Sequence, residues 1–81
     1  MTILFARGVQ ELFEELPDRV KRRATRSIGL LTVFPRMYPV RQRGLLRGYR
    51  YFGAGKYLFY YSVSGTEIRF AAILPAMMRL A

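Results

Sequence analysis

The sequence contains no cysteine and no histidine, and only five of its 81 residues are acidic. The absence of cysteine excludes a disulfide framework, which agrees with a reducing compartment. Without histidine or cysteine, most metal sites and every histidine-dependent triad or general base are excluded. Any catalysis must therefore depend on Arg, Lys, Tyr, Glu or Asp, and we expect neither a metal nor a cofactor.

A long hydrophobic run is also missing. The opening MTILFAR is too short an apolar stretch for a signal peptide or a membrane span, so we expect a cytoplasmic protein without membrane contact. With 52% hydrophobic and 23% charged residues, the composition excludes a disordered polyelectrolyte. A chain of 81 residues is long enough for one small core, so we expect a single domain over residues 1–81.

The positive charge is concentrated in one part of the chain. Residues 18–50 carry ten Lys and Arg but one acidic residue, which accounts for the whole net charge of +9. Such a segment attracts polyanions, and an acidic protein satisfies it as well as a nucleic acid does.

The stretch from Gly48 to Leu74 predicts two consecutive β-hairpins that share a central strand. Its strands are rich in aromatic and β-branched residues, and glycines at 53, 55 and 65 mark the turns. A two-residue turn at Ser64-Gly65 predicts the pairs Val63 with Thr66, Tyr61 with Ile68, Phe59 with Phe70 and Tyr57 with Ala72. These residues give the sheet an apolar face, and we expect Tyr57, Phe59, Tyr61, Ile68 and Phe70 to face the helices.

Two alternative turn lengths are possible for the first hairpin. A three-residue turn over residues 53–55 pairs Phe52 with Lys56 and adds Tyr49 and Tyr51 to the apolar face. A two-residue turn would bury Arg50 among aromatic side chains at a heavy desolvation cost, so the three-residue turn is predicted.

The opposite face of the predicted sheet then carries cations beside a tyrosine. Its members are Arg50, Lys56, Leu58, Tyr60, Glu67 and Arg69. The predicted pairing sets Arg69 opposite Tyr60 and Arg50 opposite Leu58, so Arg50, Lys56, Tyr60 and Arg69 converge. Such a face suits contact with an acidic partner, although a merely solvated face is an equally ordinary reading.

Two amphipathic helices precede the sheet. Met1 to Phe5 suits a short strand, and Val9, Leu12, Phe13 and Leu16 then follow helical spacing. Pro17 and Asp18 suit the first turn of a second helix, which Pro35 should end near Val33 or Phe34. Its inner stripe is Val20, Ala24, Ser27, Ile28 and Leu31, and its outer face is Arg19, Arg22, Arg23 and Arg26. Most charged helix faces of this kind are merely solvated.

The remaining segments are a basic loop and an apolar C-terminal segment. RMYPVRQRGLLR, residues 36–47, contains Arg41, Arg43 and Arg47 and leads into the first hairpin. After Pro75, the residues Met77, Met78 and Leu80 either cover the core or form an apolar groove for a partner. The order β-α-α-β-β-β predicts an α+β fold with a helical hairpin packed on a small antiparallel sheet.

This arrangement resembles the RelE/ParE superfamily, the toxins of type II bacterial toxin-antitoxin systems, over nearly the whole chain. The similarity is carried by the short first strand, the helical hairpin, Leu-x-x-Phe-Pro from Leu31 to Pro35, and Gly55-Lys56-Tyr57 with Tyr61 in the following strand. The resemblance implies a small basic cytoplasmic toxin that a cognate antitoxin neutralises, with Met77, Met78 and Leu80 as candidate antitoxin contacts.

The departures from the family bear on mechanism. Ribosome-dependent RNases of the RelE kind tend to have Arg where Leu58 stands, and a His or Tyr near the C-terminus, where this chain has Pro75, Ala76, Met77 and Met78. ParE-like members, which inhibit DNA gyrase, resemble the Lys56-Tyr57-Leu58 phrase but commonly carry a His-containing phrase after the last strand.

Three functions remain open at this point. The favoured one is a toxin that binds an essential target such as gyrase, with Arg41, Arg43, Arg47, Arg50, Lys56 and Arg69 as contacts. The second is an mRNA endoribonuclease in which Arg50, Lys56 and Arg69 stabilise phosphorane charge and Tyr60 moves a proton, although an unperturbed tyrosine is a poor base. The third is a non-toxic basic nucleic-acid-binding module or a decayed toxin.

Overall fold

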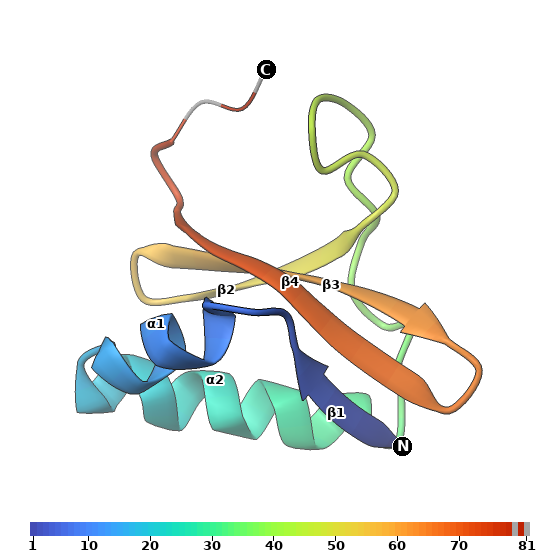
Figure 1. The fold of residues 1–81 in the computed structure, drawn as a ribbon, viewed down its shortest axis with the longest axis horizontal. Coiled ribbons are helices and arrows are strands. Elements are labelled where there is room, and N and C mark those ends of the chain that lie inside the picture. The colour runs from blue at the N-terminus through green and yellow to red at the C-terminus, as the bar shows by residue number, and fades with distance from the viewer. Residues whose placement is uncertain (79, 81) are drawn as a thin grey trace.

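In the computed structural model, which describes residues 1–78 and 80, the chain forms a four-stranded sheet with two helices on one face (Figure 1). The elements are β1 (Thr2–Phe5), α1 (Val9–Glu15), α2 (Asp18–Leu31), β2 (Arg50–Ala54), β3 (Tyr57–Ser64) and β4 (Glu67–Pro75). The strand order is β1-β4-β3-β2, in which β1 runs parallel to β4 and the other pairs are antiparallel. The predicted α+β class and element order are confirmed.

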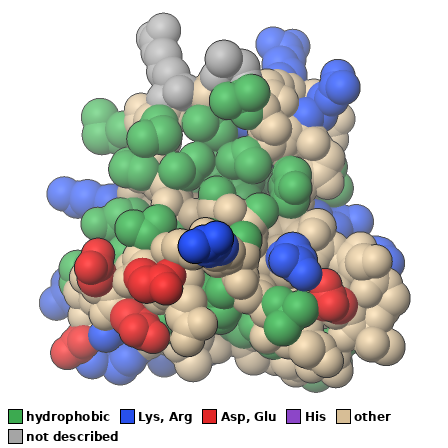
Figure 2. Space-filling model, viewed as in Figure 1, with side chains coloured by type: hydrophobic (Ala, Val, Ile, Leu, Met, Phe, Trp, Pro, Cys, Tyr) green, Lys and Arg blue, Asp and Glu red, His purple; other side chains and the backbone are tan. Residues whose placement is uncertain are grey.

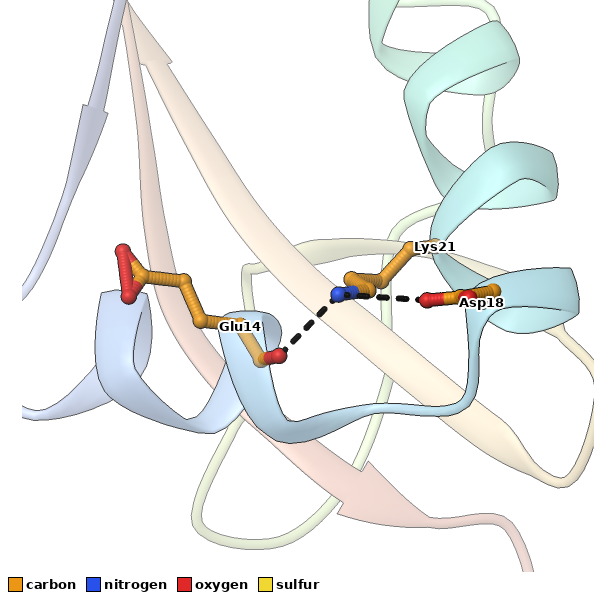
Figure 3. A network of polar contacts seen from close by, with 3 residues as sticks. All are labelled: Glu14, Asp18 and Lys21. Carbon is orange, nitrogen blue, oxygen red and sulfur yellow. Dashed lines mark hydrogen bonds and ion pairs between the residues drawn. The ribbon is translucent and has the colours of Figure 1, made fainter.

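The helical hairpin forms where the apolar spacing predicts it. Val9 is buried and Phe13 and Leu16 pack on the core, so α1 presents one stripe to the sheet. Leu16 and Pro17 are extended and separate α1 from α2. Lys21 joins the two helices, because its Nζ donates to the backbone carbonyl of Glu14 at 3.1 Å and pairs with the carboxylate of Asp18 at 3.5 Å (Figure 3).

The second helix ends slightly earlier than predicted. Its last residue is Leu31, but the backbone N–H groups of Val33 and Phe34 both donate to the Leu30 carbonyl, at 3.1 and 2.9 Å. Helix-like hydrogen bonds therefore continue to Phe34. Pro35 has no N–H to donate and disfavours a helical conformation at the residue before it, so the helix cannot extend further.

The core lies between the helices and the inner face of the sheet. Its buried members are Val9, Val20, Ala24, Leu31, Phe52, Ala54, Phe59, Tyr61, Ile68, Phe70 and Ile73. Phe52 and Phe59 stack with ring centroids 5.0 Å apart, and Phe70 meets Phe59 edge to face at 6.3 Å. The prediction that Tyr57, Phe59, Tyr61, Ile68 and Phe70 face the helices is confirmed, with Tyr57 only half-buried.

The predicted partners in the β3–β4 hairpin are wrong. The turn lies at Gly65-Thr66, so Ser64 pairs with Glu67. The observed pairs along the hairpin are Val63 with Ile68, Tyr61 with Phe70, Phe59 with Ile73 and Tyr57 with Pro75. The faces are preserved near the turn because the register changes by two residues. A β-bulge between Tyr60 and Tyr61 then adds Ala71 on β4 and moves Ile73 into the core.

The predicted turn between β2 and β3 is also wrong. Ala54 pairs with Tyr57 around a two-residue turn, so Phe52 lies opposite Phe59 and enters the core. Tyr51 pairs with Tyr60 on the other face, contrary to the prediction, and Tyr49 lies before the strand with its N–H donating to the carbonyl of Leu46. The change in register is an odd number of residues, which exchanges the two faces of β2.

Candidate functional site

The open face of the sheet is the candidate site. Both helices lie on one face, while the loop of residues 41–49 and the segment after Pro75 stand on the other (Figure 1). The floor between them is apolar, because the cross-strand rows Tyr51-Tyr60-Ala72 and Gly53-Leu58-Leu74 point away from the core. Hydrophobic side chains gather over this part of the surface, with Lys and Arg at its margins (Figure 2).

Tyr60 is placed on this face, as predicted, but it is not accessible. It is 1% exposed, and its ring lies 5.7 Å from that of Tyr51. A proton-transfer group must come within hydrogen-bond distance of the reacting oxygen. In this arrangement Tyr60 forms part of the packed floor rather than a reachable acid or base.

Arg50 lies on the helix-facing side of the sheet, opposite Tyr61 instead of Leu58. Its Nη1 donates to the backbone carbonyls of Arg36 at 3.1 Å and Tyr38 at 2.8 Å. The two carbonyls replace water around the guanidinium and so offset its desolvation cost. That cost was the reason for rejecting the two-residue turn from the sequence.

Tyr61 also binds the segment that Arg50 contacts. Its hydroxyl donates to the carbonyl of Pro35 at 3.1 Å. Burial raises the pKa of this hydroxyl above its ordinary value, although the nearby charge of Arg50 opposes the shift. The phenol therefore stays protonated at neutral pH and keeps its hydrogen bond, so Arg50 and Tyr61 together hold residues 35–38 against the end of the sheet.

Lys56 and Arg69 are separated from Arg50 and from each other. Arg69 lies opposite Ser62, not Tyr60, and pairs with the Glu67 carboxylate at 3.6 Å. Lys56 occupies the β2–β3 turn, where its carbonyl accepts a hydrogen bond from the N–H of Ala76 at 2.8 Å. The predicted convergence of Arg50, Lys56, Tyr60 and Arg69 is therefore wrong, because the observed register distributes them over both faces and a turn.

The basic loop is anchored by its backbone. The N–H of Arg41 donates to the Tyr49 carbonyl at 2.7 Å, and the N–H of Gly48 donates to the Arg41 carbonyl at 2.9 Å. These bonds close residues 41–49 into a compact projection whose arginines at 43 and 47 are exposed. Arg41 is half-buried, and its Nε is buried without a hydrogen-bond partner among the described residues.

The C-terminal segment supplies the other margin of the open face. Met77 is 95% exposed and Met78 is 50% exposed, whereas Leu80 is half-buried. Methionine side chains are flexible and polarisable, which suits contact with irregular apolar surfaces. The three predicted antitoxin contacts thus include two free apolar side chains and one that is partly covered.

An exposed apolar cluster at the end of α2 did not follow from the sequence reading. Leu30, Val33, Phe34 and Met37 are 45%, 66%, 58% and 48% exposed. Their spacing in the sequence is i, i+3, i+4 and i+7, but α2 ends at Leu31, so Leu30 lies on the helix and the other three lie in the segment that follows it. That spacing was the available signal.

The open face is suited to binding rather than to acid–base chemistry. It combines an apolar floor, exposed methionines and two exposed loop arginines, and its tyrosine is covered. Within residues 1–78 and 80, no group of three potential metal-ligating side chains comes together, and no helix is long and apolar enough to cross a bilayer. No protein-family model matches the chain, and no curated protein is significantly similar to it.

Proposed function

We propose that this protein is a RelE/ParE-type toxin of a bacterial type II toxin-antitoxin system, which acts in the cytoplasm by binding an essential target such as DNA gyrase. The observed β-α-α-β-β-β order and the helical hairpin on one sheet face agree with what the resemblance implies. The phrases that carry the resemblance also occupy defined places, with Leu31 ending α2 and Gly55-Lys56 forming the turn into β3.

The placement of Arg50 is the observation that favours target binding over RNA cleavage. Phosphoryl transfer needs preorganised cations on the surface that holds the substrate. Arg50 is instead bonded to the carbonyls of Arg36 and Tyr38 on the helix-facing side, and Tyr60 is covered. Two of the four groups in the endoribonuclease hypothesis are therefore missing from the surface that would hold the RNA, because Arg50 is on the other face and Tyr60 is covered.

The open face also provides surfaces for the two partners of such a toxin. Its apolar floor and the exposed arginines 43 and 47 suit the target, and Met77, Met78 and Leu80 suit an apolar segment of the cognate antitoxin. Because the two surfaces adjoin, an antitoxin bound at the C-terminal segment would obstruct the target.

Inducible expression in a bacterial host tests this function. We expect growth arrest with a change in the supercoiling of a reporter plasmid while transcripts remain intact. Replacing the exposed loop arginines (Arg43→Glu with Arg47→Glu) should relieve the arrest, and Arg69→Ala should not. Circular dichroism of each purified variant controls for folding.

Two outcomes would overturn the proposal. Ribosome-dependent transcript cleavage that is lost in Arg69→Ala would identify an endoribonuclease. Normal growth at a level of soluble protein that circular dichroism finds folded would identify a non-toxic basic module.

A further inference from the structure

The outward face of α2 is divided into a basic half and an apolar half. Arg19, Arg22, Arg23 and Arg26 are exposed and follow i, i+3, i+4 and i+7 spacing. One turn beyond Arg26, Leu30 is 45% exposed on the same face, and Val33 and Phe34, in the turn that follows the helix, are 66% and 58% exposed. We call these seven residues the α2 ridge.

The acidic residue nearest the ridge within α2 is Asp18, at the start of the helix, and it pairs with Lys21. Among residues 1–78 and 80, the ion pairs are Lys21 with Asp18 and Arg69 with Glu67, so no arginine of the ridge is paired. Like charges at these spacings repel one another along a helix. The core is built by the opposite side of α2, so the fold itself requires neither the arginines nor the exposed apolar side chains.

We propose that the α2 ridge binds an amphipathic helix of a partner protein, with acidic residues against the four arginines and apolar residues against Leu30, Val33 and Phe34. From Arg19 to Leu30 the helical part of the ridge extends about 16 Å at 1.5 Å per residue, or about three helical turns, and Val33 and Phe34 follow it. A helix lying along it presents carboxylates and then apolar side chains at the same one-turn repeat.

Charge excludes a second copy of this chain as the occupant. A parallel copy would place arginines against arginines, and an antiparallel copy would cover each basic half with an apolar half and desolvate unpaired charges. A nucleic acid would neutralise the arginines but leave Leu30, Val33 and Phe34 exposed to water. An acidic and apolar helix satisfies both halves.

The identity of the partner rests on the proposed function, in which this helix belongs to the antitoxin. The surface itself does not depend on toxicity. It lies on the helical side of the molecule, away from the segment after Pro75, so an antitoxin would hold the toxin at two separate places (Figure 1).

Fluorescence anisotropy with a labelled synthetic helical peptide tests the proposal. The peptide carries glutamates at i, i+3, i+4 and i+7, followed by leucines in the next turns. We expect the purified chain to bind it, and Arg22→Glu with Arg26→Glu to weaken binding at least about tenfold, because two contacts become repulsive. The matched control, Arg43→Glu with Arg47→Glu, makes the same charge change on the loop and should lower the affinity by less than about threefold.

A second pair of variants tests the apolar half. Val33→Ser should weaken binding about fivefold to tenfold, since it exposes the apolar surface of the peptide again. Leu45→Ser, at a loop residue that is 76% exposed, should leave the affinity unchanged.

Several results would overturn the inference. These are the absence of peptide binding, equal weakening by both double charge variants, or an affinity that does not respond to Val33→Ser. Binding to vesicles of phosphatidylserine and phosphatidylcholine with the same variant dependence, without peptide binding, would identify a lipid surface instead. A toxic chain that fails to bind the peptide contradicts this inference alone, whereas a harmless chain that binds it contradicts only the proposed function.

Discussion

At the scale of single residues, Arg50 joins a loop to the sheet. Its side chain enters the edge of an aromatic core beside Tyr61, yet its Nη1 finds two backbone carbonyls. A guanidinium has five donors in a rigid fork, so it can bind several acceptors of an irregular segment at once. The position therefore uses Arg for structure, and the charge is compensated by backbone dipoles rather than by a carboxylate.

We expect Arg50→Ala to lower the free energy of unfolding by about 1.5–3 kcal/mol, because hydrogen bonds from a charged donor are lost and two carbonyls are left without it. Urea unfolding followed by circular dichroism measures the change. The matched control is Arg43→Ala, an exposed arginine whose removal should change stability by less than about 0.5 kcal/mol. Equal stability of the two variants would contradict the structural role of Arg50.

At the scale of elements, the β2–β3 hairpin is held against α2 at Gly55. This glycine has φ +59°, and a Cβ built on it would lie 2.8 Å from Cγ2 of Val20. Gly65, in the β3–β4 turn, has the same φ of +59° but nothing within 4 Å of the equivalent position. The two turns therefore share the positive φ that disfavours a side chain, and of these two glycines Gly55 alone has a steric requirement as well.

We expect Gly55→Ala to destabilise the protein by about 1–3 kcal/mol more than Gly65→Ala, since the φ penalty is common to both and the overlap with Val20 is not. Thermal or urea unfolding of both variants provides the comparison. In the background of Val20→Ala, which removes the colliding methyl group, the difference should shrink. A Gly65→Ala variant as unstable as Gly55→Ala would show that the contact with α2 has no energetic effect.

The elements were predictable where side-chain periodicity decides them. Val20, Ala24 and Leu31 follow helical spacing, and Phe59 and Tyr61 alternate along β3, so their burial follows from the pattern alone. The faces of β2 were not predictable, because they depend on carbonyls of residues 36 and 38 whose positions come from the folded loop. The bulge at Ala71 also lacks a sequence signal, as the residues around it are small and apolar.

The candidate site was less predictable than the fold for the same reason. The predicted convergence of Arg50 and Arg69 depended on the pairing of three strands, and an odd change in the register of β2 moves Arg50 to the other face. Arg43 and Arg47 lie away from the apolar pattern and are exposed, whereas Arg41 of the same loop is half-buried. The sequence left open whether Met77 covers the core, and the structure shows it 95% exposed.

At the scale of the whole molecule, the excess of positive over negative charge is the main electrostatic feature. A net charge of +9 is confined within 30 × 29 × 22 Å. The two ion pairs among the described residues, Lys21 with Asp18 and Arg69 with Glu67, are both partly exposed to solvent. Pairs of this kind contribute little to stability, whereas repulsion among the remaining cations acts across the whole molecule and favours expansion.

This balance predicts that salt stabilises the protein. The Debye length falls from about 30 Å at 0.01 M to about 8 Å at 0.15 M ionic strength, so sodium chloride in this range screens repulsion between distant cations. The midpoint of thermal unfolding should therefore rise across this range. Replacing two unpaired arginines of α2 (Arg22→Gln with Arg26→Gln) should raise the midpoint at low salt and flatten its salt dependence. A fall in the midpoint with added salt would mean that attractive pairs outweigh repulsion, because screening weakens whichever interaction dominates. The sign of the salt effect thus decides whether the excess charge destabilises the isolated chain, as expected of a surface that acidic partners neutralise.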